Sequence, residues 1–195
     1  MNHRFQLRHL LAATAALLGS VTSALAYGGL AGGGVALINT ISSETYPTLT
    51  IVAASSATDA IIATGTIDNN SDHGWKLTVA STNHGILKRT TGTGDSGTLG
   101  VGTEILYTNI KLVKTSGTLG AGLTDPAGVP KDISDNGGTP GTIIFNTGAS
   151  VGSHGTATTA TCAYVYALKI NYAADTTLLQ GTYSDTLTLT LDVDT

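Results

Sequence analysis

The last fifteen residues, GTYSDTLTLTLDVDT (residues 181–195), carry the clearest strand pattern in the sequence. Leu187, Leu189, Leu191 and Val193 alternate there with threonine and aspartate residues. Because successive side chains of a β-strand point to opposite faces, this alternation predicts a strand with one apolar and one polar face. The predicted strand reaches almost to the last residue, so we expect no later strand to pair with it.

Strand patterns recur along the chain at residues 48–54, 60–67, 75–81, 104–114, 141–145 and 161–173. The irregular phase of residues 104–114 suggests a bulge within one long strand. Threonine suits a pleated surface and glycine suits turns, and both residue types are abundant, whereas no segment shows a helical stripe. The sequence therefore predicts an all-β protein, an immunoglobulin-like β-sandwich of about six or seven strands.

The last strand can be used in two ways. If residues 161–173 pair with residues 183–193, the chain ends while the sandwich still lacks a strand, and a sheet edge stays open to another chain. In that case Leu187, Leu189, Leu191 and Val193 would line an acceptor groove. The alternative is that the last strand pairs with an early one and the sandwich is complete.

Residues 1–26 have the three parts of a secretory signal peptide. Arg4 and Arg8 precede a short apolar run, and the small residues Ala24-Leu25-Ala26 fit a cleavage site. We therefore expect export, a mature chain that begins near Tyr27, a flexible arm at residues 27–41 and one sandwich domain at residues 42–195. No later segment is apolar enough for a membrane span.

The charge of the chain limits which partners it could bind, and its cysteine content limits whether a disulfide can stabilise it. Without Arg4 and Arg8, seven basic residues face thirteen acidic ones. This mildly acidic balance argues against nucleic acid and anionic lipid as partners. The single cysteine, Cys162, excludes an internal disulfide. Because Cys162 is in phase with the apolar residues of segment 161–173, we expect a small buried hydrophobe rather than a reactive thiol.

The sequence offers no credible active site, so we expect neither an enzyme nor a bound cofactor. No pair of carboxylates stands in an apolar setting. His73 and His84 flank the strand at residues 75–81 and would lie roughly 36 Å apart in a straight segment, too far to share a metal. A weak calcium candidate remains at Asp68, Asn70 and Asp72, whose alternating oxygens start like a calcium loop, but the later ligands of such a loop are missing.

Residues 27–41, YGGLAGGGVALINTI, combine a glycine-rich start with a short alternating segment. Val35, Leu37, Asn39 and Ile41 share one face of that segment, and the glycines before them make an arm that could not fold alone. Two interpretations stay open. The segment is either a donor strand that completes the sheet of another copy or the first strand of its own domain.

The ending resembles that of a known family. The stretch YALKINYAADTTLLQGTYSDTLTLTLDV (residues 166–193) is similar to the C-terminal hairpin of chaperone–usher pilins, in particular the spore-coat-U-like fimbrial group. NNSDHGWKLTVASTNHGIL (residues 69–87) and ILYTNIKL (residues 105–112) resemble other strands of that group. The sharpest part is GTYSDT, residues 181–186. Members usually carry a disulfide near the first strands, where this chain has no cysteine.

The resemblance implies a fimbrial subunit that polymerises with copies of itself by donor-strand exchange. It also implies a periplasmic chaperone and an outer-membrane usher as partners, transit through the periplasm, and a place in an extracellular, adhesive fibre at the cell surface. A second hypothesis is a monomeric secreted β-sandwich that binds carbohydrate or acts as a calcium-dependent adhesin. Its site would lie in the loops at residues 90–102 and 116–139.

Overall fold

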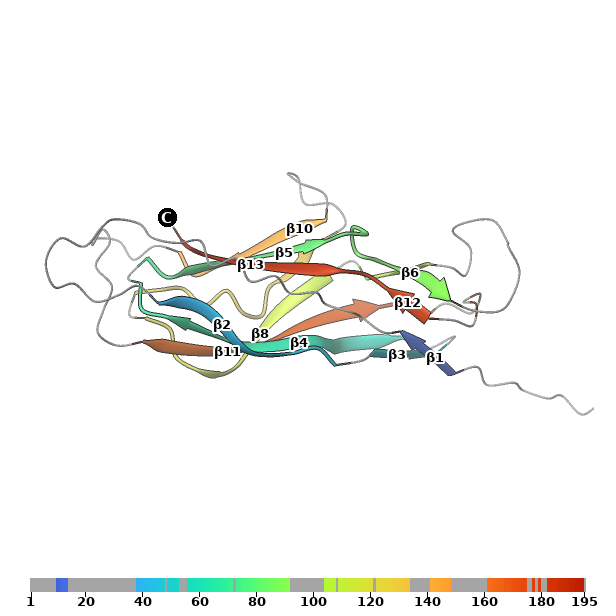
Figure 1. Ribbon diagram of the computed structural model, residues 1–195, viewed down its shortest axis with the longest axis horizontal. Helices are drawn as coiled ribbons and strands as arrows, with labels where there is room; N and C mark the ends of the chain where they lie inside the picture. Colours follow the sequence, from blue (N-terminus) through green and yellow to red (C-terminus); the bar gives the residue numbers. More distant parts are fainter. Residues whose placement is uncertain are drawn as a thin grey trace, which may run out of the picture.

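All regular structure in the described part of the chain is β-strand, which confirms the all-β prediction (Figure 1). The computed structural model describes residues 10–13, 38–47, 49–52, 56–71, 73–91, 104–107, 109–120, 122–133, 141–148, 161–174, 177, 179 and 182–194. Thirteen strands and no helix occur in these residues, and every pairing between the strands is antiparallel.

One layer is a five-stranded sheet. Its order is β2 (Asn39–Thr45), β4 (Ala57–Asn69), β11 (Cys162–Tyr172), β8 (Asn109–Gly117) and β9 (Pro130–Asp132). The long strands β4 and β11 form its centre. Among the described strands, β2 and β9 lie at its two edges.

The other layer consists of two three-stranded sheets placed end to end (Figure 1). The first sheet has the order β10 (Thr142–Asn146), β5 (Trp75–Ser81), β13 (Leu187–Val193), and the second has the order β7 (Glu104–Leu106), β6 (Ile86–Thr91), β12 (Thr182–Ser184). The chain continues from β5 into β6 and from β12 into β13. These four strands therefore act as two long antiparallel strands, each interrupted once.

The two layers face each other across one apolar core, the arrangement of a β-sandwich. The rings of Trp75 in β5 and Tyr164 in β11 meet edge to face with their centroids 5.1 Å apart, which joins the layers directly. Trp75, Leu77 and Val79 are buried on one face of β5, as the alternation predicts. Burying each large apolar side chain contributes roughly 1.5–3 kcal/mol.

The segment at residues 104–114 is not one bulged strand, and that prediction is wrong. β7 pairs with β6 in one layer, whereas β8 pairs with β11 in the other. The chain changes layer at Tyr107, whose side chain is buried and whose amide donates to the carbonyl oxygen of Gly85 at 2.9 Å. The irregular phase of the sequence reflects this crossing.

The pairing considered for the last strand is also absent. β11 lies between β4 and β8, so both of its edges are occupied, and β13 pairs with β5 in the opposite layer. The chain therefore crosses between layers after β11 instead of forming a hairpin. The alternative pairing, between the last strand and an earlier strand, is the one that occurs.

Two shorter strands lie near the beginning of the chain. β1 (Leu10–Ala13) pairs with β3 (Leu49–Val52), and β1 falls inside the segment predicted to be the signal peptide. Cys162, at the start of β11, is a free thiol that is half-buried rather than fully buried.

Candidate strand-acceptor edge

β13 lies at a sheet edge, because β5 is the only described strand that pairs with it over its whole length. The side chains of Leu187, Leu189 and Leu191 are buried in the core, and that of Val193 is half-buried. The alternating threonines point away from the core and are half-buried as well. The four apolar residues thus share one face, as the sequence predicts.

The direction of the backbone groups of β13 follows from the hydrogen bonds around β5. Thr82 N donates to the carbonyl oxygen of Thr186 at 2.9 Å, so residues 186 and 82 form a hydrogen-bonded pair. Hydrogen-bonded and non-hydrogen-bonded pairs alternate along an antiparallel ladder. Residues 188, 190 and 192 therefore bond to β5, whereas residues 187, 189, 191 and 193 direct their N–H and C=O groups to the outer edge.

The bonds on the other side of β5 agree with this assignment. Ser81 N donates to Gly141 O at 2.6 Å, and Thr147 N donates to Trp75 O at 3.1 Å. The odd-numbered residues of β5 thus bond toward β10 and the even-numbered residues toward β13. As a result, Leu187, Leu189, Leu191 and Val193 combine core-facing side chains with edge-facing backbone groups. An added strand would form its main-chain hydrogen bonds with these backbone groups.

β2 lies beside β13, at the neighbouring edge of the facing sheet (Figure 1). It pairs with β4 through Asn39↔Asn69 and Ile41↔Ile67, and the pairing then shifts by one residue between Ser42 and Thr45. Residues 43 and 44 of β2 thus stand opposite the single residue Gly65 of β4, which defines a β-bulge. Ser43 has a positive φ of 53°.

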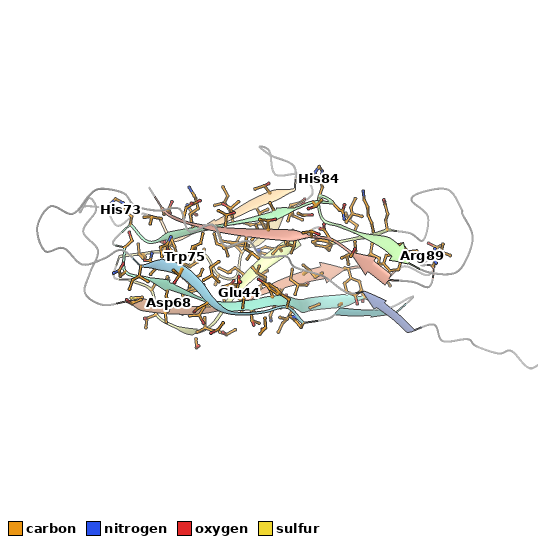
Figure 2. All side chains as sticks on the ribbon, viewed as in Figure 1. Glu44, Asp68, His73, Trp75, His84 and Arg89 are labelled. Atoms are coloured by element: carbon orange, nitrogen blue, oxygen red, sulfur yellow. The ribbon has the colours of Figure 1, made fainter. Side chains whose placement is uncertain are left out.

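The bulge changes which side chains of β2 face the core. Because one extra residue is inserted, Glu44 and Tyr46 come into phase with Ile41, on the inner face. Burial raises the pKa of Tyr46 to about 12, and the adjacent Glu44 raises it in the same direction. Neither Glu44 Oε1 nor the Tyr46 hydroxyl, both buried, has a hydrogen-bond partner of acceptable geometry among the described residues. Figure 2 shows Glu44 about midway along the molecule.

A buried polar network holds the interruption between β12 and β13. Asp185, which is 3% exposed, accepts from Ser81 Oγ at 2.6 Å and from the Tyr107 hydroxyl through one carboxylate oxygen. Its other oxygen accepts from the backbone N–H groups of Asn83, at 3.0 Å, and Thr186, at 2.7 Å. Asp185 thereby joins the β5–β6 break, the β7–β8 crossing and the final strand.

The network around Asp185 changes the pKa of Tyr107, and Asp185 itself belongs to the GTYSDT stretch. Burial, and then the negative charge of Asp185, raise the pKa of Tyr107 above its usual value. Tyr183 of the same stretch is fully buried, and its hydroxyl donates to the carbonyl oxygen of Leu179 at 2.6 Å. The sequence pattern did not single out Asp185 as a structural centre. Its position between two strand segments, next to Ser184, was the available signal.

The predicted donor residues are only partly within the described chain. Val35 and Leu37 lie outside the described residues, whereas Asn39 and Ile41 belong to β2 and pair with β4. Just before β2, Ile38 and Asn70 are joined by two bonds, from Ile38 N to Asn70 Oδ1 at 2.7 Å and from Asn70 N to Ile38 O at 3.1 Å. Donation of this segment to another copy stays a prediction.

Two side chains of the calcium candidate lie within the described residues, and both accept hydrogen bonds within the fold. Asp68 Oδ2 accepts from Ser42 Oγ at 2.9 Å, and Asn70 Oδ1 accepts from the backbone of Ile38. Asp72 lies outside the described residues. His73 and His84 lie at opposite ends of β5 (Figure 2). In the described residues, no group of three or more His, Cys, Asp or Glu side chains is placed to hold a metal ion.

The edges formed by β9 and β10 are shorter than β13, whereas β2 has the same length. β9 has three residues and begins with Pro130, which lacks an N–H group, and β10 has five residues. β13 has seven residues and pairs with β5 without a register shift. Within the described ranges, no helix is long and apolar enough to cross a membrane.

The chain is thus a β-sandwich in which the regular strand β13 lies at the edge of its sheet among the described strands. No family model, curated protein sequence or solved structure matches the chain.

Proposed function

We propose that the protein is a structural subunit of an extracellular fibre and polymerises by strand exchange. The N-terminal arm of one copy would add to β13 of the next copy and complete its sheet. The observation that carries this proposal is the dual orientation of Leu187, Leu189, Leu191 and Val193. Their side chains face the core, while their backbone groups face an edge at which no other described strand pairs.

The arm has a suitable length and composition. Residues 27–37 comprise eleven residues, more than the seven residues of β13 with which they would pair. Seven residues in extended conformation span about 23 Å. Val35 and Leu37 would bring apolar side chains, and the glycines before them let the arm adapt its path.

Asn39 and Ile41 would take part in a different way. Both residues already pair with β4, so donating them to another copy requires the start of β2 to separate from β4. Residues 27–37 lie outside the described residues, and a donor strand drawn from them leaves the pairing of Asn39 and Ile41 with β4 in place. A donor strand of residues 27–37 therefore explains exchange with the least disturbance of the domain, and the four-residue set Val35, Leu37, Asn39, Ile41 describes a deeper exchange.

The export signal and the family resemblance add the cellular context. The proposed route is secretion by the signal peptide, passage through the periplasm with a chaperone, and assembly at an outer-membrane usher. The resulting fibre would serve in adhesion at the cell surface. The immunoglobulin-like connectivity belongs to the same proposal.

Deletion of residues 27–37 from the mature protein tests the proposal, because this deletion leaves Ile38 and β2 intact. We expect fibres in electron micrographs of the mature protein and none after the deletion. A second variant keeps the length of the arm but carries Val35→Asp and Leu37→Asp on the donor face, and it should also stay monomeric. Normal fibres from the deleted protein would reject strand exchange.

A cross-link identifies the two partners directly. In a Cys162→Ala background, Val35→Cys and Val193→Cys are placed in separate preparations and mixed before assembly. We expect a disulfide-linked dimer in the mixture and none in either preparation alone. The monomeric binding domain, the alternative function, predicts instead that the mature protein elutes as a monomer in size-exclusion chromatography.

A further inference from the structure

Two neighbouring strands, β2 and β13, each present an edge on the same side of the sandwich. An open edge can pair with any extended chain, including the same edge of another copy. A subunit with two usable edges would form branched or laterally associated assemblies. The difference between the two edges therefore bears on how the protein assembles.

β13 is regular, whereas β2 is not. β13 pairs with β5 through seven consecutive residues without a shift. β2 is interrupted by the bulge at Ser43 and Glu44, and Ser43 takes a positive φ that is uncommon for a residue other than glycine. The extra residue breaks the regular row of N–H and C=O groups that an added strand needs.

Glu44 adds a second obstacle to pairing at β2. Its side chain faces inward and is only partly buried as a whole, while its Oε1 is buried without a hydrogen-bond partner among the described residues. A strand added beside β2 would remove more water from this carboxylate and offer it no cation. Burying a polar or charged group without a partner is unfavourable.

We propose that the Ser43–Glu44 bulge closes the β2 edge to strand addition and so directs the arm of a second copy to β13. Each subunit then has one acceptor edge, and the polymer grows without branching. The direction of growth rests on the proposed function, but the closing of the β2 edge does not. Inward-pointing charges and bulges are known means of protecting sheet edges.

The test uses the mature protein without residues 27–37, which cannot donate an arm. In this background, Ser43 is deleted and Glu44 is replaced by valine, which restores a regular β2 with an apolar inner face. We expect this variant to self-associate at concentrations at least tenfold lower than its parent in analytical ultracentrifugation. A variant that stays monomeric over the same range as the parent, with its β-sheet circular dichroism intact, overturns the proposal.

Three further variants keep the test decisive. Ser43→Gly retains the bulge and removes the backbone strain, so it should stay monomeric. Glu104→Val removes one negative charge from the edge strand β7 and should also leave association unchanged. If this variant unfolds, Glu44 alone is deleted, which also removes the extra residue of the bulge. A folded deletion variant that associates no more than its parent overturns the proposal.

The experiments distinguish a failure of the proposed strand donation from a failure of the proposed role of the bulge. If the arm-bearing protein forms no fibres but the regularised β2 variant still associates, strand donation is rejected and the closed β2 edge is retained. If fibres form but the regularised variant in the arm-bearing chain gives the same unbranched fibres, strand donation stands and the role of the bulge is rejected.

Discussion

Replacing Asp185 by alanine removes the acceptor on which three separate chain segments converge. Four donors lose their partner, and two of them, the hydroxyls of Ser81 and Tyr107, belong to buried residues. Hydrogen bonds to a charged group contribute about 1.5–3 kcal/mol each, and a backbone N–H near the surface recovers part of its loss from water. We therefore expect Asp185→Ala to lower the free energy of unfolding by about 3–5 kcal/mol.

Urea denaturation followed by tryptophan fluorescence measures this change, because the single tryptophan, Trp75, is buried in the core. For a domain of this size, 1 kcal/mol corresponds to about 2–4 °C, so the melting temperature should fall by roughly 6–20 °C. Tyr107→Phe removes one of the four bonds and should lower the free energy of unfolding by about 1–2 kcal/mol. A loss below about 1 kcal/mol for Asp185→Ala would refute the central role of this carboxylate.

Two other predictions concern the core. A Cβ atom at Gly65 would lie 2.8 Å from the hydroxyl oxygen of Tyr166, so Gly65→Ala should lower the free energy of unfolding by about 1–3 kcal/mol, and Tyr166→Leu in the same chain should recover part of the loss in urea denaturation. Burial first, and then nearby acidic groups, raise the pKa values of Tyr46, which reaches about 12, and of Tyr107 and Tyr164. The folded state then holds these protons more tightly than the unfolded state, so the associated stability is fully present below pH 10 and is lost as the pH rises toward 12. Melting temperatures between pH 8 and 11.5 measure this, and Tyr46→Phe should reduce the alkaline loss; a flat profile above pH 10 would contradict it.

The sequence predicts which side chains of a strand face the core, because core-facing and outward-facing residues alternate along a strand. The alternation at Trp75, Leu77 and Val79 and at Leu187, Leu189 and Leu191 predicts which side chains are buried, and the structure confirms it. This information is local and does not depend on the partner strand.

The pairing of the strands could not be predicted in the same way. Period two does not say that the chain changes layer at Tyr107 or that β11 has both edges occupied. Short strands such as β9, whose residues Pro130–Asp132 have no alternating pattern, exist because a long neighbour, β8, offers backbone groups. Tertiary context decides these elements.

The two polar groups that shape the candidate edge were also missed. From the sequence alone, Asp185 is expected in an ordinary turn, and Glu44 is expected on the polar face of its strand. The buried position of Asp185 depends on Ser81 and Tyr107, which are far away in the sequence. The inward position of Glu44 depends on one inserted residue, and a shift of one residue reverses the face of every side chain after it.

Amide hydrogen exchange at β13 tests the central claim most directly. In the mature protein without residues 27–37, the amides of Thr188, Thr190 and Asp192 bond to β5 and should exchange slowly, whereas those of Leu189, Leu191 and Val193 face the free edge and should exchange fast. In the assembled fibre, the second set should become as protected as the first. Equal protection of both sets in the isolated protein, or fast exchange of the second set in the fibre, would contradict the account.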